Sequence, residues 1–395
     1  MIRRHTFVAL ALLAGSLPVS LHVSEAQAGE TLYEKGDASL DFSADFRFRI
    51  EQDWNSLRGD GTEREDRLRL RIRARGKLDA NFNKNFGAVV RLRTGYKGSQ
   101  QSPNITIYDF DGESIGDSSL FFDLWYLKFQ SGGFDFWIGR NQLNLWRQDE
   151  YIYDDDISAL GLGVNYTHRL GPGEMTWQGG YGTLPVGMTE FVGKYANAQV
   201  VYRQESKQQG FTVALGFIDT MADPDDPAGD LLLTDNNTRD YKTLSLQAQY
   251  RLYTLSKLLR LGVTAGHNFE DYSDEPVDSF SEFHKDDVDF YTVFVKWGST
   301  KHLGDWMLGY YWAHIEALAL NSSYTEDDWV RWGTLNGQTR ATNMRGSEFR
   351  FAVGLSKKAD MVARLYLVDA PELLRVGDTT KETGNRARID FNFRF

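Results

Sequence analysis

The stretch that decides the fold is residues 67–75, which read Arg67-Leu68-Arg69-Leu70-Arg71-Ile72-Arg73-Ala74-Arg75. Every second residue is an arginine, and the residues between the arginines are apolar. Successive side chains of a β-strand point to opposite faces, so this period of two predicts a strand with one charged face and one apolar face. Segments 40–50 and 386–395 alternate in the same way. The sequence therefore predicts strands that separate an apolar from a polar environment.

Weaker alternation recurs along most of the remaining chain. It is found near 86–97, 119–130, 133–141, 158–169, 173–183, 194–205, 209–219, 238–252, 257–270, 286–298, 304–317, 343–356 and 358–369. With the three segments above, this makes about sixteen strands. An even number is what single-chain bacterial outer-membrane barrels have.

Short turns and long polar segments alternate between these expected strands. The long segments are 52–63, 98–118, 142–157, 184–193, 220–237, 271–285, 318–342 and 370–383. Short periplasmic turns and long extracellular loops are typical of outer-membrane barrels, whereas a soluble sandwich has no reason to gather its long loops at one end. We therefore expect an all-β protein: one transmembrane antiparallel up-and-down β-barrel of about sixteen strands.

The first residues predict an export signal. Arg3 and Arg4 precede an apolar stretch at 6–17, and Ala26-Gln27-Ala28 fits the small-x-small pattern of a signal-peptidase site. The apolar stretch is too short to span a membrane. We expect a signal peptide at 1–28 and the barrel at 29–395.

Composition excludes several other classes. The mean hydropathy of −0.46 and the lack of an apolar run of membrane-spanning length after the signal exclude a helical membrane protein. Cysteine is absent, which excludes disulfides and thiolate metal sites. Aromatic residues make up 14% of the chain, as aromatic girdles require. The net charge of −11 reflects acidic residues in the expected loops, for example at 223–230, which we interpret as a solvated extracellular face beside lipid and lipopolysaccharide.

The alternating arginines are expected to line the interior of the barrel. An arginine that faces lipid at the bilayer midplane costs about 2–4 kcal/mol, so these side chains must point inward. The last strand closes against the first, which would place twelve arginines on one continuous quarter of the wall. This basic wall consists of Arg47, Arg49, Arg67, Arg69, Arg71, Arg73, Arg75, Arg91, Arg93, Arg386, Arg388 and Arg394.

Two interpretations of the basic wall compete. In the first, the arginines pair with Asp41, Asp45, Asp66, Asp79 and Asp390 and stiffen the lumen. In the second, the excess positive charge concentrates anions and guides them through a narrow pore. These acids are fewer than the arginines, which favours the second interpretation.

Segment 142–157 differs from the other long loops because it mixes apolar anchors with carboxylates. Its candidate constriction residues are Trp146, Arg147, Asp149, Glu150, Asp154, Asp155 and Asp156. Folded into the barrel, the loop would oppose the basic wall and create a transverse field across a constriction. Folded outward, it would be an extracellular flap. The sequence leaves both alternatives open.

Enzymatic and nucleic-acid functions find little support. Residues 112–116 match the G-x-S-x-G pattern of serine hydrolases, but that motif needs a strand before it and a helix after it. Here it lies in an acidic, glycine-rich segment, so we interpret the match as chance. The basic residues alternate along strands and form no helical or flexible basic arm, unlike a nucleic-acid site. We expect no catalytic residue, no metal site and no cofactor.

Three short stretches carry a resemblance to a known family: Phe122-Asp123-Leu124-Trp125-Tyr126, Ile138-Gly139-Arg140 and Tyr153-Asp154-Asp155-Asp156-Ile157. They resemble the putative porins of proteobacteria, as does the strand at 67–75. The alginate-export family is similar too, since its members share a β-barrel, a strand end like Gly139-Arg140 and an arginine-rich conduit. The resemblance implies a passive conduit, and the porin superfamily suggests a homotrimer.

The sequence therefore predicts a bacterial outer-membrane porin for passive, anion-favouring diffusion of small hydrophilic solutes. One alternative is an alginate-export-like conduit for an anionic polysaccharide. The others are a non-conducting structural barrel and an outer-membrane enzyme.

Overall fold

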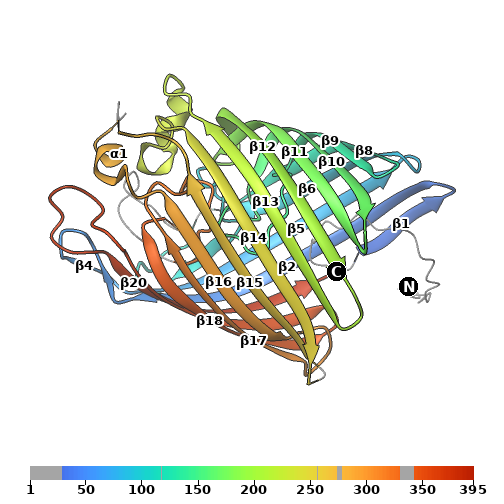
Figure 1. Cartoon of the computed structure of the whole chain (residues 1–395). Coiled ribbons are helices and arrows are strands. Elements are labelled where there is room, and N and C mark those ends of the chain that lie inside the picture. The colour runs from blue at the N-terminus through green and yellow to red at the C-terminus, as the bar shows by residue number, and fades with distance from the viewer. Residues whose placement is uncertain (1–28, 117, 256, 274–277, 330–341) are drawn as a thin grey trace.

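The computed structural model describes residues 29–395 except 117, 256, 274–277 and 330–341. Its main feature is a closed antiparallel barrel of sixteen strands, as expected (Figure 1). The strands are β2 (Ala38–Trp54), β5 (Arg67–Asn81), β6 (Phe86–Gly95), β8 (Ser119–Ser131), β9 (Phe134–Gln142), β10 (Ser158–Leu170), β11 (Gly173–Val186), β12 (Glu190–Glu205), β13 (Gln209–Met221), β14 (Tyr241–Thr254), β15 (Lys257–Asn268), β16 (Asp289–Gly298), β17 (Trp306–Ile315), β18 (Met344–Ser356), β19 (Ala359–Asp369) and β20 (Thr383–Arg394). The expected signal peptide at 1–28 lies outside the described residues.

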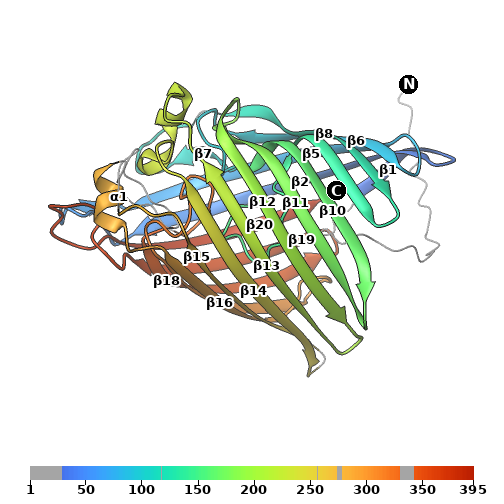
Figure 2. The same cartoon turned by 45° about the horizontal axis from the view of Figure 1, so that its top comes forward.

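The barrel closes where β20 pairs with β2. Arg394 lies opposite Asp45 and Arg386 lies opposite Asp53 in this pair. Just below it, the Phe395 N–H donates to the Ala44 carbonyl at 2.8 Å. The short strand β1 (Gly29–Lys35) pairs with the first residues of β2 and extends the wall past the end of β20 (Figure 2). The sequence pattern of 29–35 did not predict this strand.

The alternation in the sequence corresponds to side chains that point alternately to the lumen and to the outer face of the barrel. Along β13, exposed and buried residues alternate without a break from Gln209 to Ile218. Phe211, Val213, Leu215 and Phe217 are exposed on the outer face, as large apolar residues are on most strands. Outward apolar and inward polar positions are what a barrel in lipid requires.

The connections match the expected alternation with one exception. We expected a long loop at 184–193, but β11 continues to Val186, β12 begins at Glu190, and Leu184 pairs with Val192. A tight turn replaces the loop because Gly187 adopts a φ of +58°, which glycine reaches without steric cost. The Gly187 N–H is bound by the Gln100 side chain.

Where the structure describes the other long connections, they carry short elements. They are β3 (Ser56–Leu57), β4 (Glu63–Arg64), β7 (Ile105–Asp109), the 3₁₀ turns η1 (Pro227–Leu231) and η2 (Leu233–Asp235), and α1 (Ser279–His284). Among the described residues, no helix is long and apolar enough to cross a membrane.

Candidate functional site

The barrel brings the twelve expected arginines onto four adjacent strands. The strand order β20–β2–β5–β6 follows from the pairings of β2 with β20 and β5, and of β5 with β6. Arg47 lies opposite Arg73, Arg49 opposite Arg71, and Arg75 opposite Arg93. Directly paired residues of neighbouring strands face the same side of a sheet, and the outward positions of these strands are apolar. The arginines therefore share the inner face.

Carboxylates neutralise this wall more fully than the sequence suggested. Each of the twelve arginines has a carboxylate within salt-bridge distance. At least eight carboxylates of the described residues take part: Asp45, Glu51, Asp53, Asp123, Asp156, Asp328, Asp360 and Asp390. Several carboxylates are shared; Glu51 pairs with Arg49, Arg69 and Arg71.

The partners are mostly not those we expected. Of the five acids considered from the sequence, Asp45 and Asp390 are the ones that pair with wall arginines among the described contacts. Asp79 instead binds Lys128 at 2.5 Å, and Asp41 accepts from the hydroxyls of Thr31 and Ser39. The actual partners occupy inward positions on the arginine strands themselves or arrive from β8, β19 and two loops, which only the barrel closure brings near.

Segment 143–157 folds into the barrel. From β9 it first runs along the inner wall, where the Asn144 amide donates to the carbonyls of Val164 and Gly179 at 2.9 and 2.8 Å. The Gln148 amide then donates to Thr264 Oγ1 and the Val263 carbonyl, both at 2.6 Å.

The loop reaches the far wall before it turns back. Asp149 accepts weakly from the hydroxyls of Thr264 and Thr292, on β15 and β16. The return arm ends at the basic wall, where Asp156 Oδ1 lies 2.9 Å from Arg75 Nη1 and 3.6 Å from Arg93 Nη1. The loop thus spans the lumen, the first of the two alternatives left open by the sequence.

Glycines on the inner wall make room for this loop. A Cβ at Gly262 would lie 2.7 Å from Gln148 Oε1 and 2.2 Å from the Phe294 ring. A Cβ at Gly180 would meet Asn144 Cβ at 3.5 Å and Asn197 Oδ1 at 2.4 Å. Both positions therefore need the absence of a side chain for the loop and its supporting residues to lie against the strands.

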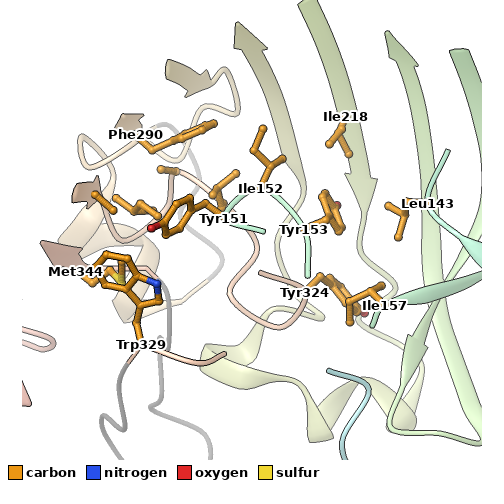
Figure 3. Packing of buried hydrophobic residues seen from close by; sticks show 14 of the residues in the cluster. Leu143, Tyr151, Ile152, Tyr153, Ile157, Ile218, Phe290, Tyr324, Trp329 and Met344 are labelled. Carbon is orange, nitrogen blue, oxygen red and sulfur yellow. The ribbon is translucent and has the colours of Figure 1, made fainter. Parts of the chain in front are cut away.

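A second loop enters the barrel and meets the first. Residues 317–325, which follow β17, are buried throughout. The Asp154 N–H donates to the Tyr324 carbonyl at 2.9 Å, and the rings of Tyr153 and Tyr324 stack with centroids 6.4 Å apart. The Tyr151 ring packs edge-on against Trp329. Figure 3 shows these rings beside Leu143, Ile152 and Phe290 in one buried apolar cluster inside the barrel.

The two loops place carboxylates opposite the arginines. Burial raises the pKa of Asp155 to about 7, helped by Asp156 and Glu150, and burial raises the pKa of Asp149 to about 6. Burial also opposes ionisation of Asp156, but the guanidinium groups of Arg75 and Arg93 outweigh it and hold the pKa at about 2. Asp156 is therefore ionised at neutral pH, whereas Asp155 exchanges its proton there.

The second loop also contains one carboxylate with a raised pKa and one with a lowered pKa. Burial, with Asp328 and Glu150 nearby, raises the pKa of Glu326 well above its usual value. For Asp328, the attraction of Arg388 and Arg49 outweighs burial and holds the pKa well below its usual value. Arginines of the basic wall thus lower the pKa of Asp156 and Asp328, whereas burial beside other carboxylates raises the pKa of Asp155 and Glu326.

In the part of the chain that the structure describes, two trios of carboxylates could hold a cation. Oxygens of Glu150, Glu326 and Asp328 lie within 4.8 Å of one another, as do those of Asp154, Asp155 and Asp156. Carboxylate oxygens are the ligands of hard divalent cations. In the first trio, Glu150 comes from loop 143–157, whereas Glu326 and Asp328 come from the second inward loop.

The remaining expected constriction residues help to fix the loop. Arg147 Nη1 donates to the carbonyls of Tyr153 and Asp154 at 2.8 and 2.9 Å, so it ties the two arms together. The backbone N–H of Trp146 donates to the side-chain oxygens of Gln178 on β11 and Gln199 on β12. Neither residue faces the basic wall in these contacts.

Sequence reasoning missed a second group of basic residues that face the lumen. They are Arg260, Lys296, Arg350 and Arg364, on β15, β16, β18 and β19. Arg350 and Glu348 lie two residues apart on β18, and Arg364 and Tyr366 lie two residues apart on β19, so each pair shares the inner face of the barrel. The alternation in 343–356 and 358–369 could therefore have predicted that these arginines face the lumen. Each strand holds only one or two such residues, which made the pattern less conspicuous than in 67–75.

The hydrolase-like segment 112–116 has no catalytic setting in the described residues. Ser114 forms an isolated bridge with Asp109 just after β7, and β8 follows at Ser119. The strand–turn–helix of a nucleophile elbow is therefore not formed here.

Residues 60–221 match the model of a family described as "Putative porin", which confirms the resemblance drawn from the sequence. No curated protein matches the chain. Among solved structures, OprB of Pseudomonas putida at high pH is 11% identical with a TM-score of 0.52, over 90% of this chain and 94% of that chain. OmpF of Salmonella typhi in complex with daunomycin is 11% identical with a TM-score of 0.53, over 93% and 100%.

OmpT, an outer-membrane protein of Vibrio cholerae folded in vitro, is 9% identical with a TM-score of 0.50, over 93% of this chain and 100% of that chain. At such identities these likenesses show the fold alone.

Proposed function

We propose that this chain is a bacterial outer-membrane porin that lets small hydrophilic solutes diffuse passively with a preference for anions. The observation that carries the proposal is the basic wall on β20, β2, β5 and β6. Its arginines outnumber the carboxylates that pair with them in the described part of the chain, and arginine stays charged at any relevant pH. An excess of one charge inside a narrow lumen concentrates ions of the opposite sign.

The inward loop 143–157 supports the same proposal. It brings Asp156 into contact with Arg75 and Arg93 and places Asp154 and Asp155 beside it, so that the loop and the basic wall together bound the proposed constriction. A small solute with an anionic group can keep that group on the arginine side while the rest of the molecule stays near the loop. Passage is then governed by size and charge, with no covalent step and no cofactor.

Proteoliposome swelling tests the proposal. Gluconate and glucosamine are similar in size and opposite in charge, and glucose is neutral. We expect gluconate to enter fastest and glucosamine slowest. Equal rates for the three solutes, or faster entry of glucosamine, would contradict anion preference.

Arg47→Gln is the sharpest variant for this assay. The Arg47 side chain is 15% exposed and lies 3.9 Å from Asp390, which Arg49 holds at 2.6 Å. Its removal therefore leaves no carboxylate without a partner, and we expect the gluconate-to-glucosamine ratio to fall. Arg345→Gln removes an exposed arginine paired with Asp369 at the outer end of β18 and should leave the ratio unchanged.

A second candidate function is a barrel that does not conduct. The buried cluster formed by loops 143–157 and 316–329 favours it, because these loops occupy much of the lumen. No swelling with any of the three solutes would support this candidate over the first. An alginate-export-like conduit stays an alternative that the family match does not favour.

The remaining partners belong to the same proposal. Lipid contacts the outward apolar residues, and lipopolysaccharide lies beside the acidic loops. We also propose a homotrimer, as the resemblance to porins implies. Chemical cross-linking of intact cells that gives a band of three chains would support the trimer, and a largest band of two chains at saturating cross-linker would contradict it.

A further inference from the structure

Basic residues follow one another along a single rung of the sheet, outside the basic wall. Direct cross-strand partners link Arg260 to Lys296, Lys296 to Gly309, Gly309 to Arg350, Arg350 to Arg364, and Arg364 to Arg388. Partners in a rung face the same side of a sheet. Since Arg388 belongs to the basic wall, the whole rung faces the lumen.

The rung descends through the barrel because the strands are tilted. At one end, Arg388 lies in the middle of β20, a strand that begins after a long loop. At the other end, Arg260 lies three residues after Lys257, the first residue of β15, which follows a short turn. The rung thus leads from the basic wall toward the end of the barrel with short turns.

Positive charge on this rung is compensated less than on the basic wall. Apart from the partners of Arg388, which belongs to the basic wall, Glu348 is the carboxylate that pairs with the rung in the described ion pairs, at 2.6 Å from Arg350 and 3.8 Å from Arg364. Lys296 instead lies over the rings of Phe294 and Tyr311, with its Nζ 4.3 and 5.1 Å from their centroids. Asp149 of the inward loop acts on Lys296 through space, but the two form no salt bridge among the described contacts.

Polar atoms at this place lack partners in the described part of the chain. Arg260 Nε has no hydrogen-bond acceptor, and neither does the hydroxyl of Tyr311, a residue that is 3% exposed. The Arg350 guanidinium lies 4.3 Å from the centroid of the Tyr311 ring, so these groups are close together. A buried polar group without a partner is costly, and an anion bound here would supply acceptors.

We propose that Arg260, Lys296, Arg350 and Arg364 form a binding site for a small oxyanion that carries two negative charges. The proposal rests on the proposed function, because the lumen is the route to the site. Guanidinium groups offer paired N–H donors that match phosphate or carboxylate oxygens, and the Lys296 ammonium adds a point charge. The four cations face one carboxylate, Glu348, so a doubly charged anion offsets more of their charge than a singly charged one does. The site would hold the anion after it leaves the basic wall.

Inorganic phosphate is the probe for the first test. The purified full-length chain is reconstituted in a planar bilayer in KCl, and phosphate is added while the chloride current is recorded. We expect phosphate to reduce the current with a saturating concentration dependence. An anion-selective current that phosphate leaves unchanged would overturn the site and leave the proposed function standing.

Arg260→Gln and Lys296→Gln locate the site, because neither removes the salt-bridge partner of a carboxylate. Each variant should raise the half-blocking phosphate concentration about tenfold, since each removes one charged donor. Lys128→Gln is the matched control: it removes an inward cation of β8, already paired with Asp79, and should leave the half-blocking concentration unchanged. Equal block in all variants would overturn the assignment of these residues.

Calorimetric titration of phosphate into the detergent-solubilised protein measures binding directly, so it tests the site even if the barrel carries no current. Saturable binding that weakens in Lys296→Gln would support the site even in a barrel that does not conduct. Such a result would separate the binding site from the proposed function. No heat of binding would overturn it.

Discussion

Arg91 and Asp123 illustrate how single residues hold the basic wall in place. Arg91 Nη2 donates to Asp123 Oδ2 at 2.6 Å and Arg91 Nε to Asp123 Oδ1 at 3.1 Å. Asp123 is fully buried, and Arg91 is 6% exposed. The well-aligned hydrogen bonds between the two side chains offset the cost of burying both charges. Removing either member would leave the other as a buried charge without its main partner, which is destabilising.

We predict that Arg91→Gln destabilises the barrel by about 3 kcal/mol, the lower end of the range for breaking a buried ion pair. The lower end applies because Arg93 Nε lies 3.8 Å from Asp123 and partly replaces the lost charge. Urea unfolding followed by tryptophan fluorescence measures the change. The double variant Arg91→Gln/Asp123→Asn should recover much of the loss. A double variant as unstable as the sum of the two single variants would contradict the coupling.

The sequence predicted which face of the barrel each strand residue points to, but it did not predict the partners of that residue. Alternation in 67–75 assigned all its arginines to the lumen, because a period of two leaves no other choice in lipid. Asp123 was read only as part of a family-like stretch. Its role opposite Arg91 depends on the register of β6 against β8, which shifts between Arg91 and Leu92, and alternation alone does not reveal such a bulge.

At the scale of elements, loop 143–157 controls the lumen. Its mixture of apolar and acidic residues marked it as unusual, but only the contacts with β15, β16 and the second loop decide that it folds inward. Nothing in the sequence pattern of 318–342 indicated that residues 317–325 would also be buried. Their burial depends on Tyr153 and Tyr324 meeting inside the barrel, far apart in sequence.

The protonation of this loop predicts a dependence of conductance on pH. Burial raises the pKa of Asp149 to about 6 and of Asp155 to about 7, from 3.8 in the unfolded chain. Groups with raised pKa values stabilise the docked loop fully below the unfolded value, and this contribution is lost as the pH rises through the folded values. The docked loop should therefore loosen between about pH 4 and 7, and single-channel conductance should be higher at pH 8 than at pH 5.

Asp155→Asn separates this mechanism from general effects of pH. An asparagine stays neutral, so the variant should keep a lower conductance than the parent protein at pH 8. Asp225→Asn, at an exposed position of another loop, should behave like the parent protein. Conductance that falls with rising pH in the parent protein would contradict the proposed role of Asp155.

At the scale of the whole molecule, the net charge of −11 is compatible with the basic wall, because carboxylates pair with its arginines and further acidic residues lie in the loops. The barrel turns arginines inward on β20, β2, β5 and β6 and continues them along the rung to Arg260. Many acidic residues lie in the loops at the end with long connections. The sixteen strands and their order were predictable from the sequence, whereas the filling of the lumen was not, because it depends on contacts between distant loops.

The reversal potential of the reconstituted protein under a KCl gradient tests anion guidance most directly. If the basic wall guides anions as proposed, the reversal potential has the sign for chloride preference, with a smaller magnitude in Arg47→Gln. A reversal potential of the sign for potassium preference would contradict guidance by the arginines, and so would a chloride preference indifferent to Arg47. A chain that inserts into the bilayer and carries no current would contradict conduction itself.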